Sequence, residues 1–205
     1  MKLYSYVMKY DEGFAPNPYH GYLTLATCKQ VIRKVADVGD FIIGTGSKPR
    51  GDVGKLIHIM EVSETLTFQE SSADSRFQAK IPVLSNNKVQ QVGDNIYHYE
   101  NGYFIQLNSV HSDKDGNTVE GHKETDLSGI KVLISNNFVY YGNNSKLIPS
   151  EFRNCNGQDI CIKNSNHKTF DDNNYPKLAE FIKWAYDREP IETMVMGRPS
   201  DWKVI

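Results

Sequence analysis

The chain has 205 residues, of which 39% are hydrophobic and 23% charged, which is ordinary for a soluble globular protein. Its formal net charge of −2 excludes a global basic field, so any contact with nucleic acid requires a local basic patch. Three cysteines without a C-x-x-C pair favour a reducing cytosol over a disulfide scaffold. No apolar run reaches the roughly twenty residues that span a bilayer, and the N-terminus is not a signal peptide. We therefore expect a cytoplasmic protein without membrane contacts.

The first predicted element is a strand over residues 2–10, whose alternating side chains give one aromatic face. A loop over residues 11–21 follows, because its two prolines and two glycines exclude regular structure. Rigid loops carry binding sites well, and this one offers Phe14, Asn17 and Tyr19 as candidate ligand contacts.

Residues 24–47 predict a short helix, a turn and a strand. Thr27 is placed to cap the helix just before Cys28, and apolar residues follow at helical spacing. Gly39 and Asp40 end the helix in a turn, since glycine accepts a left-handed conformation.

The strand over residues 41–43 leads into Gly-Thr-Gly-Ser at residues 44–47. Two of these four residues lack a Cβ, so the backbone there can approach a ligand closely. We expect Thr45 and Ser47 to hydrogen-bond a base edge, with a turn that caps its own backbone as the alternative.

The rest of the chain predicts further strands, a hairpin and two helices. Asn101 and Gly102 tolerate positive φ and mark the hairpin. His58, in the middle of a strand, is expected to be a satisfied core histidine. The expected elements are a strand at 55–62, a short helix at 69–77, hairpin strands at 96–100 and 103–107, a strand at 130–141 broken at 136–137, and an amphipathic helix at 177–187.

Several segments together resemble the second nucleotide modification associated domain family, over residues 2–149. They are DEGFAPNPYHGYLTLATCKQVIR, VGDFIIGTGS, LTFQE, GDNIY, QLNSVHS and LISNNFVYYG. The order strand, loop, helix, Gly-Asp, strand, small loop, strand also resembles the start of a PUA-like barrel of the EVE subtype. This resemblance implies an α+β fold, a mixed barrel with inserted helices and a C-terminal helix. We expect one domain over 1–205, with a family-like core at 1–149 and an extension at 150–205.

The resemblance also implies a function. The family is assigned to base modification from its neighbours in phage and bacterial genomes, and PUA-like relatives bind nucleic acid, some around a flipped modified base. Our main hypothesis is therefore a module that binds a base, with nucleic acid or a nucleotide as ligand and a modification or restriction enzyme as partner. The expected base contacts are Phe14, Asn17, Tyr19, Thr45, Ser47, Asp94, Asn95 and Tyr97, and the expected phosphate contacts are Lys29, Arg33, Lys48 and Arg50.

Two other functions stay open. An enzyme acting on a nucleotide or base would use Cys28 as nucleophile, His111 as acid and base, and Asp94 as carboxylate. A protein-interaction domain would use the C-terminal helix. No motif with metal-ligand spacing is present, although His98, His111 and His122 accompany Asp94, Asp113 and Asp126, so neither a metal nor a cofactor is expected.

Overall fold

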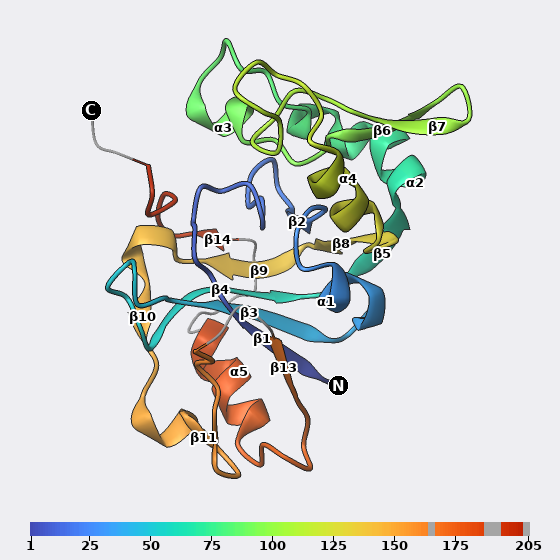
Figure 1. Ribbon diagram of the computed structural model, residues 1–205. Coiled ribbons are helices and arrows are strands. Elements are labelled where there is room, and N and C mark those ends of the chain that lie inside the picture. The colour runs from blue at the N-terminus through green and yellow to red at the C-terminus, as the bar shows by residue number, and fades with distance from the viewer. Residues whose placement is uncertain (164–166, 187–193, 203–205) are drawn as a thin grey trace. The chain divides into compact units, whose positions relative to one another are not determined.

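The computed structural model describes residues 1–163, 167–186 and 194–202 (Figure 1). The chain forms two compact units, and each is built from segments far apart in the sequence. Unit 1 contains Met1–Asp11, Ala36–Ser63 and Ser135–Ile205, and unit 2 contains Glu12–Val35 and Glu64–Ile134. None of the described helices is long and apolar enough to cross a bilayer.

Unit 1 is organised by a seven-stranded sheet. Its order is β13–β1–β3–β4–β9–β14, and β10 pairs with β4 beside this path. Strand β1 runs parallel to β3 and antiparallel to β13, whereas β4 is antiparallel to both β3 and β9. The strands are β1 Leu3–Val7, β3 Phe41–Thr45, β4 Lys55–Glu61, β9 Asn137–Tyr140, β10 Lys146–Leu147, β13 His167–Phe170 and β14 Met194–Val195.

Helix α5 (Leu178–Tyr186) covers part of this sheet and contacts β4 and β9. Leu178, Phe181 and Ala185 recur at helical spacing and are buried in the core, so the predicted amphipathic helix is confirmed. Its expected last residue, Asp187, lies outside the described residues. The smaller elements of unit 1 are η2 Gly142–Asn144, η3 Ser150–Phe152, β11 Asn154–Cys155 and β12 Gln158–Asp159. The expected extension at 150–205 therefore shares a core with the first strand of the chain.

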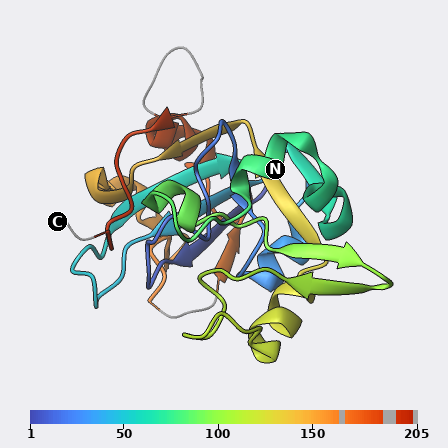
Figure 2. The same ribbon diagram turned by 90° about the horizontal axis from the view of Figure 1, so that it is seen from above.

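Unit 2 combines a three-stranded sheet, a hairpin and short helices. The sheet has the order β2–β8–β5, and the hairpin is formed by β6 and β7. Asn101 and Gly102 join the hairpin strands with φ values of 51° and 93°, as predicted (Figures 1 and 2). The elements are β2 Leu23–Leu25, α1 Gln30–Val35, β5 Glu64–Thr67, α2 Phe68–Ala73, η1 Ser75–Lys80, α3 Lys88–Gln91, β6 Tyr97–Glu100, β7 Tyr103–Gln106, α4 Glu120–Leu127 and β8 Lys131–Ser135.

The mixed α+β class is confirmed, but the predicted barrel is not. In the described part of the chain, the sheet of unit 1 ends at β13 and β14, and no strand pairing joins these two ends. One predicted strand, over residues 130–141, is divided between two sheets. It is interrupted at Asn136, and its halves, β8 and β9, pair in different sheets. A PUA-like barrel is therefore not confirmed.

The glycine-rich corner after β3 faces the protein's own atoms in unit 1. Thr45 is fully buried and donates to the backbone oxygen of Tyr6 at 3.2 Å. A Cβ on Gly46 would lie 2.0 Å from the backbone oxygen of Asp52. The corner therefore uses its small residues to pack its own backbone, which is the alternative considered for it, and Thr45 does not reach a solvent-exposed ligand.

This packing gives a first testable prediction. We expect Gly46→Ala to destabilise the protein by about 1–3 kcal/mol, because the added methyl forces the Asp52 backbone to move. Urea denaturation measures the change. Gly121→Ala is the matched control, since a Cβ there meets nothing within 4 Å. Equal stability of the two variants would contradict the prediction.

His58 is a core histidine as predicted, but it is satisfied at one nitrogen only, because its buried Nδ1 has no hydrogen-bond partner. His58 is fully buried in β4, and its Nε2 lies 2.9 Å from the hydroxyl of Tyr6. Burial lowers the pKa of His58 to about 3, so the ring is neutral. It is a structural group of unit 1.

Candidate catalytic site

The candidate site begins at a strained turn in unit 2 between β2 and α1. Cys28 and Lys29 have φ values of 55° and 42°, in the left-handed region that non-glycine residues rarely adopt. Helix α1 therefore starts at Gln30, two residues later than predicted, and the buried hydroxyl of Thr27 has no hydrogen-bond partner. Thr27 does not cap the helix. The turn instead presents the half-buried thiol of Cys28.

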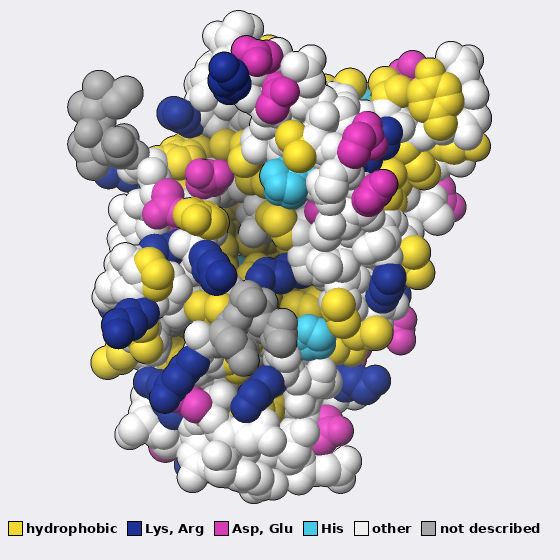
Figure 3. All heavy atoms as spheres, in the orientation of Figure 1, with side chains coloured by type: hydrophobic (Ala, Val, Ile, Leu, Met, Phe, Trp, Pro, Cys, Tyr) yellow, Lys and Arg dark blue, Asp and Glu magenta, His cyan; other side chains and the backbone are white. Residues whose placement is uncertain are grey.

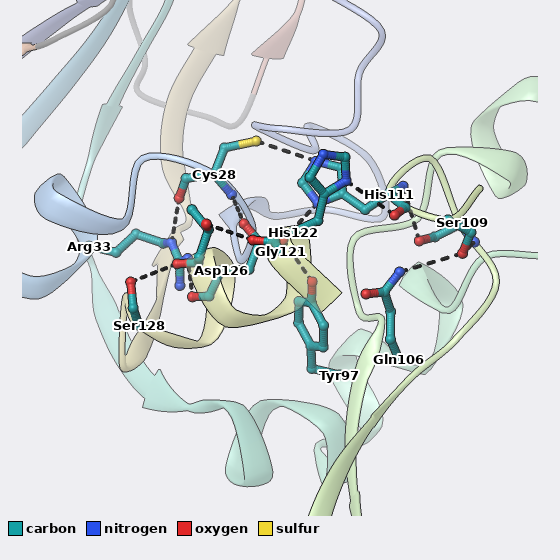
Figure 4. A network of polar contacts seen from close by, with 12 residues as sticks. Cys28, Arg33, Tyr97, Gln106, Ser109, His111, Gly121, His122, Asp126 and Ser128 are labelled. Carbon is teal, nitrogen blue, oxygen red and sulfur yellow. Dashed lines mark hydrogen bonds and ion pairs between the residues drawn. The ribbon is translucent and has the colours of Figure 1, made fainter. Parts of the chain in front are cut away.

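The thiol meets a histidine from a distant loop. His111 follows β7, and its Nε2 lies 3.6 Å from the Sγ of Cys28 (Figure 4). The other ring nitrogen, Nδ1, lies 2.7 Å from Oδ2 of Asp126 on α4. Cysteine, histidine and aspartate thus form a continuous relay. This is the arrangement by which a carboxylate orients an imidazole that activates a nucleophile.

The carboxylate of Asp126 accepts hydrogen bonds from three groups. Besides His111, it accepts the hydroxyl of Tyr97 at Oδ2, 2.8 Å away, and the backbone N–H of Cys28 at Oδ1, 2.6 Å away. Its side chain is only 2% exposed. A buried carboxylate with this many partners holds one orientation, and it fixes both the imidazole and the backbone of the cysteine.

A buried arginine supports the same turn. Arg33 of α1 is fully buried, and its guanidinium donates to the backbone oxygens of Cys28 and Asp126 (Figure 4). It also donates to the backbone oxygen of Lys131 at 3.0 Å. Gly129 makes room for it, because a Cβ there would lie 2.4 Å from the guanidinium carbon. The hydrogen bonds of Arg33 thus connect the turn at Cys28 with the end of α4 and the start of β8. Arg33 does not lie on an exposed helix face, because its guanidinium is buried and binds backbone oxygens of the protein, and its contact with phosphate stays a prediction.

Two further rings enclose His111. The ring of Phe14 packs edge-on against it at 4.8 Å between centroids, and the ring of His122 lies 4.9 Å away. Phe14 is buried, with 4% of its surface exposed. The predicted stacking residue therefore packs on the imidazole of His111.

These contacts set the charge of His111. Burial lowers its pKa, but the hydrogen bonds to Asp126 and Cys28 and the charges of both groups outweigh burial and raise it to about 9. The site thus favours an imidazolium next to the sulfur at neutral pH.

Stability should depend on pH as a result. The folded pKa of about 9 exceeds the unfolded value of 6.5, so the folded state binds more protons between these values. The stabilisation is complete below pH 6.5 and is lost as the pH rises through 9. We expect the free energy of unfolding to fall across this window, by at most about 3 kcal/mol.

Urea denaturation at several pH values measures this slope. His111→Gln should lose most of it, whereas His98→Gln, which changes a histidine of β6 in the same unit, should retain it. An unchanged slope in His111→Gln would refute the assignment.

Comparison with known proteins gives one match. The family described as "Nucleotide modification associated domain 2" matches residues 1–205, the whole chain. The chain belongs to this family. No curated protein and no solved structure matches. Membership confirms the predicted resemblance and extends it beyond residues 2–149.

Asp94, predicted as the carboxylate of the site, has a different position in this family member. It is buried, accepts the hydroxyl of Thr24 at 2.7 Å and lies near the buried Lys80. Burial raises the pKa of Asp94 to about 6 and lowers that of Lys80 to about 8, although the charge of each partner opposes the shift. The carboxylate next to His111 is that of Asp126, whereas Asp94 was predicted there.

The other predicted base contacts of unit 2 bind the protein itself. Asn17 is buried and accepts the ammonium of Lys80 at 2.6 Å. Asn95 donates to the backbone oxygen of Phe77 at 3.2 Å, and Tyr97 is engaged by Asp126. Tyr19 is half-buried, and its backbone N–H lies 3.3 Å from the side-chain oxygen of Asn17.

The predicted phosphate contacts fall in both units. In unit 1, Lys48 is exposed, and Arg50 is paired with the carboxylate of Asp52 at 2.6 Å. The same carboxylate accepts the backbone N–H of Ser47, which was predicted as a base contact. In unit 2, Lys29 is half-buried. Figure 3 shows several Lys and Arg side chains on the face in view, with Asp and Glu side chains on the same face. A contact of Lys29, Lys48 or Arg50 with phosphate stays a prediction.

The histidine and aspartate side chains that were considered as metal ligands make other contacts within the protein. His98 approaches the backbone oxygen of Asn95, and Asp113 closes its own turn with Asn117. Within the described residues, no group of three or more His, Cys, Asp or Glu side chains is placed to hold a metal ion.

Proposed function

We propose that this chain is a thiol-dependent enzyme of nucleotide-modification systems. Cys28 is the nucleophile, His111 is the general base and acid, and Asp126 positions His111. The observation that carries this proposal is the relay from Sγ to Nε2 at 3.6 Å and from Nδ1 to the carboxylate at 2.7 Å. Its place in nucleotide modification is supported by the family.

The chemistry follows from the geometry. The imidazole takes the thiol proton, and the thiolate attacks an electrophilic carbon of the substrate to form a covalent adduct. The imidazolium then returns its proton to the atom that received the electron pair. Asp126 keeps the proton on Nδ1, so that Nε2 faces the sulfur as a base. The strained φ of Cys28 is consistent with a backbone held for function.

This proposal reverses the order of the two main hypotheses from the sequence. Of the residues expected to stack on or bind a base, Phe14, Asn17, Thr45 and Tyr97 are buried and contact the protein itself. A nucleotide or nucleic acid remains our expected substrate, and a modification or restriction enzyme our expected partner. A PUA-like relationship and a cytoplasmic location also stay predictions.

The test is a search for chemistry that requires Cys28. The purified protein is incubated with mononucleotides and short oligonucleotides, and mass spectrometry follows both the substrate and the intact protein. We expect a product or a protein adduct with the native chain and with Cys161→Ser, which removes a buried cysteine of unit 1. Cys28→Ser and His111→Ala should give neither. Tight nucleotide binding by all four proteins without chemistry would support a binding module.

A further inference from the structure

The relay has an unusual feature that concerns the substrate. In acyl-transfer enzymes, the backbone N–H of the nucleophile commonly helps to bind the oxyanion of the tetrahedral intermediate. Here the N–H of Cys28 donates to Oδ1 of Asp126 at 2.6 Å. That amide is occupied, and its partner is a negatively charged group next to the nucleophile.

This arrangement disfavours negative charge on an atom bonded to the reacting centre. A carboxylate beside the cysteine backbone would repel an oxyanion formed at that amide, and the imidazolium of His111, which is itself paired with this carboxylate, offsets the repulsion only in part. Arg33 does not offset it for a substrate, because its described hydrogen bonds go to backbone oxygens of the protein. The site therefore suits an electrophile whose negative charge appears farther from the sulfur.

Nucleotides contain one such electrophile. Attack on phosphorus, on C4 of cytosine or on C6 of adenine puts charge on an oxygen or nitrogen bonded to the attacked atom. Attack on C6 of a pyrimidine instead moves charge through the ring to O4 of uracil or N3 of cytosine, three bonds away. Only this last case separates the new charge from the carboxylate of Asp126.

We infer that Cys28 adds to C6 of a pyrimidine nucleotide, an inference that rests on the proposed function and names its substrate class. The Sγ–C6 bond forms as the C5–C6 double bond breaks, and the electron pair moves to O4 or N3. His111, which took the thiol proton, delivers it to C5, the neighbour of the attacked carbon. The original C5 hydrogen then leaves as a proton to the solvent, its electron pair re-forms the C5–C6 double bond, and the Sγ–C6 bond breaks to release the thiolate.

The position of His111 fits this step. Its Nε2 lies 3.6 Å from Sγ, so it can serve the atom next to the carbon that the sulfur attacks. Phe14 and His122 pack against the imidazole and restrict its movement. The addition activates C5, which is the position at which a nucleotide-modification system could attach a new group.

Exchange of the C5 hydrogen tests the inference without a second substrate. The native chain is incubated in D₂O with dUMP, with dCMP and with a short single-stranded oligonucleotide that contains both bases, and proton NMR follows the H5 signal. We expect H5 to disappear at least tenfold faster than with Cys28→Ser, while His98→Ala behaves like the native chain. Exchange in the mononucleotides identifies free nucleotides as substrates, and exchange only in the oligonucleotide identifies nucleic acid.

A parallel measurement separates the two levels of the proposal. Iodoacetamide labelling of Cys28 is compared in the native chain and in His111→Ala. If labelling depends on His111 but no probe exchanges H5 above the Cys28→Ser rate, the pyrimidine inference is wrong and the thiol-dependent function stands. If labelling does not depend on His111, both fail.

Discussion

Replacing His111 with alanine should slow the alkylation of Cys28 by iodoacetamide at pH 7 about tenfold. The imidazole of His111 lies 3.6 Å from Sγ and can take the thiol proton as the sulfur attacks, and alanine removes this base. The loss stays near tenfold because a more stabilised thiolate is also a weaker nucleophile. Rates are measured by mass spectrometry of the peptide that contains Cys28.

The structure supplies the controls for this measurement. Cys155 and Cys161 are buried, so they should remain unlabelled while the protein is folded. His98→Ala removes a histidine of the same unit that approaches a backbone oxygen, and it should leave the rate unchanged. Asp126→Asn should give an intermediate rate, since the imidazole keeps a hydrogen-bond partner but loses the carboxylate charge. Equal rates in the native chain and His111→Ala would exclude the relay.

Replacing Arg33 with alanine should destabilise the protein by about 3–5 kcal/mol. The change removes a fully buried guanidinium and leaves three backbone oxygens without their donor. It also removes the contact with the ring of Phe68, 5.3 Å from the guanidinium carbon. Urea denaturation followed by circular dichroism measures the loss.

Lys34→Ala is the matched control for Arg33→Ala. Lys34 is the next residue of α1 and is exposed, so its removal should change stability by less than about 0.5 kcal/mol. Arg33→Lys should fall between the two, because a single ammonium cannot reproduce the planar fork that reaches three oxygens. A loss below about 1 kcal/mol in Arg33→Ala would show that these contacts are weak.

The local elements of the fold were predictable because their signals are local. The turn at Asn101–Gly102, the amphipathic helix with Phe181 and the strand break at Asn136 each follow from backbone preference or spacing within a few residues. The barrel prediction is not confirmed, because closure depends on which strands pair. The residues on either side of Asn136 give no sign that one strand joins the sheet of β4 and the other that of β5.

The site was only half predictable for a similar reason. Cys28 and His111 were recognised as a possible pair from their chemistry, but Asp94, Asp113 and Asp126 look alike in sequence. The choice of Asp126 depends on the path of α4. The sequence predicts Arg33 on a solvated helix face, because a lysine or arginine at helical spacing usually faces solvent, whereas here Gly129 provides space for it in the interior.

The order of segments in the chain has a practical consequence for dissecting this protein. The polypeptide passes between the two units four times, near residues 11, 35, 63 and 134. Cys28 precedes the segment Ala36–Ser63, which supplies β3 and β4 of unit 1, and His111 and Asp126 follow it. No single truncation can therefore isolate the relay intact. A fragment that contains the relay without unit 1 would need Val35 joined to Glu64 by an engineered linker, with both outer segments removed.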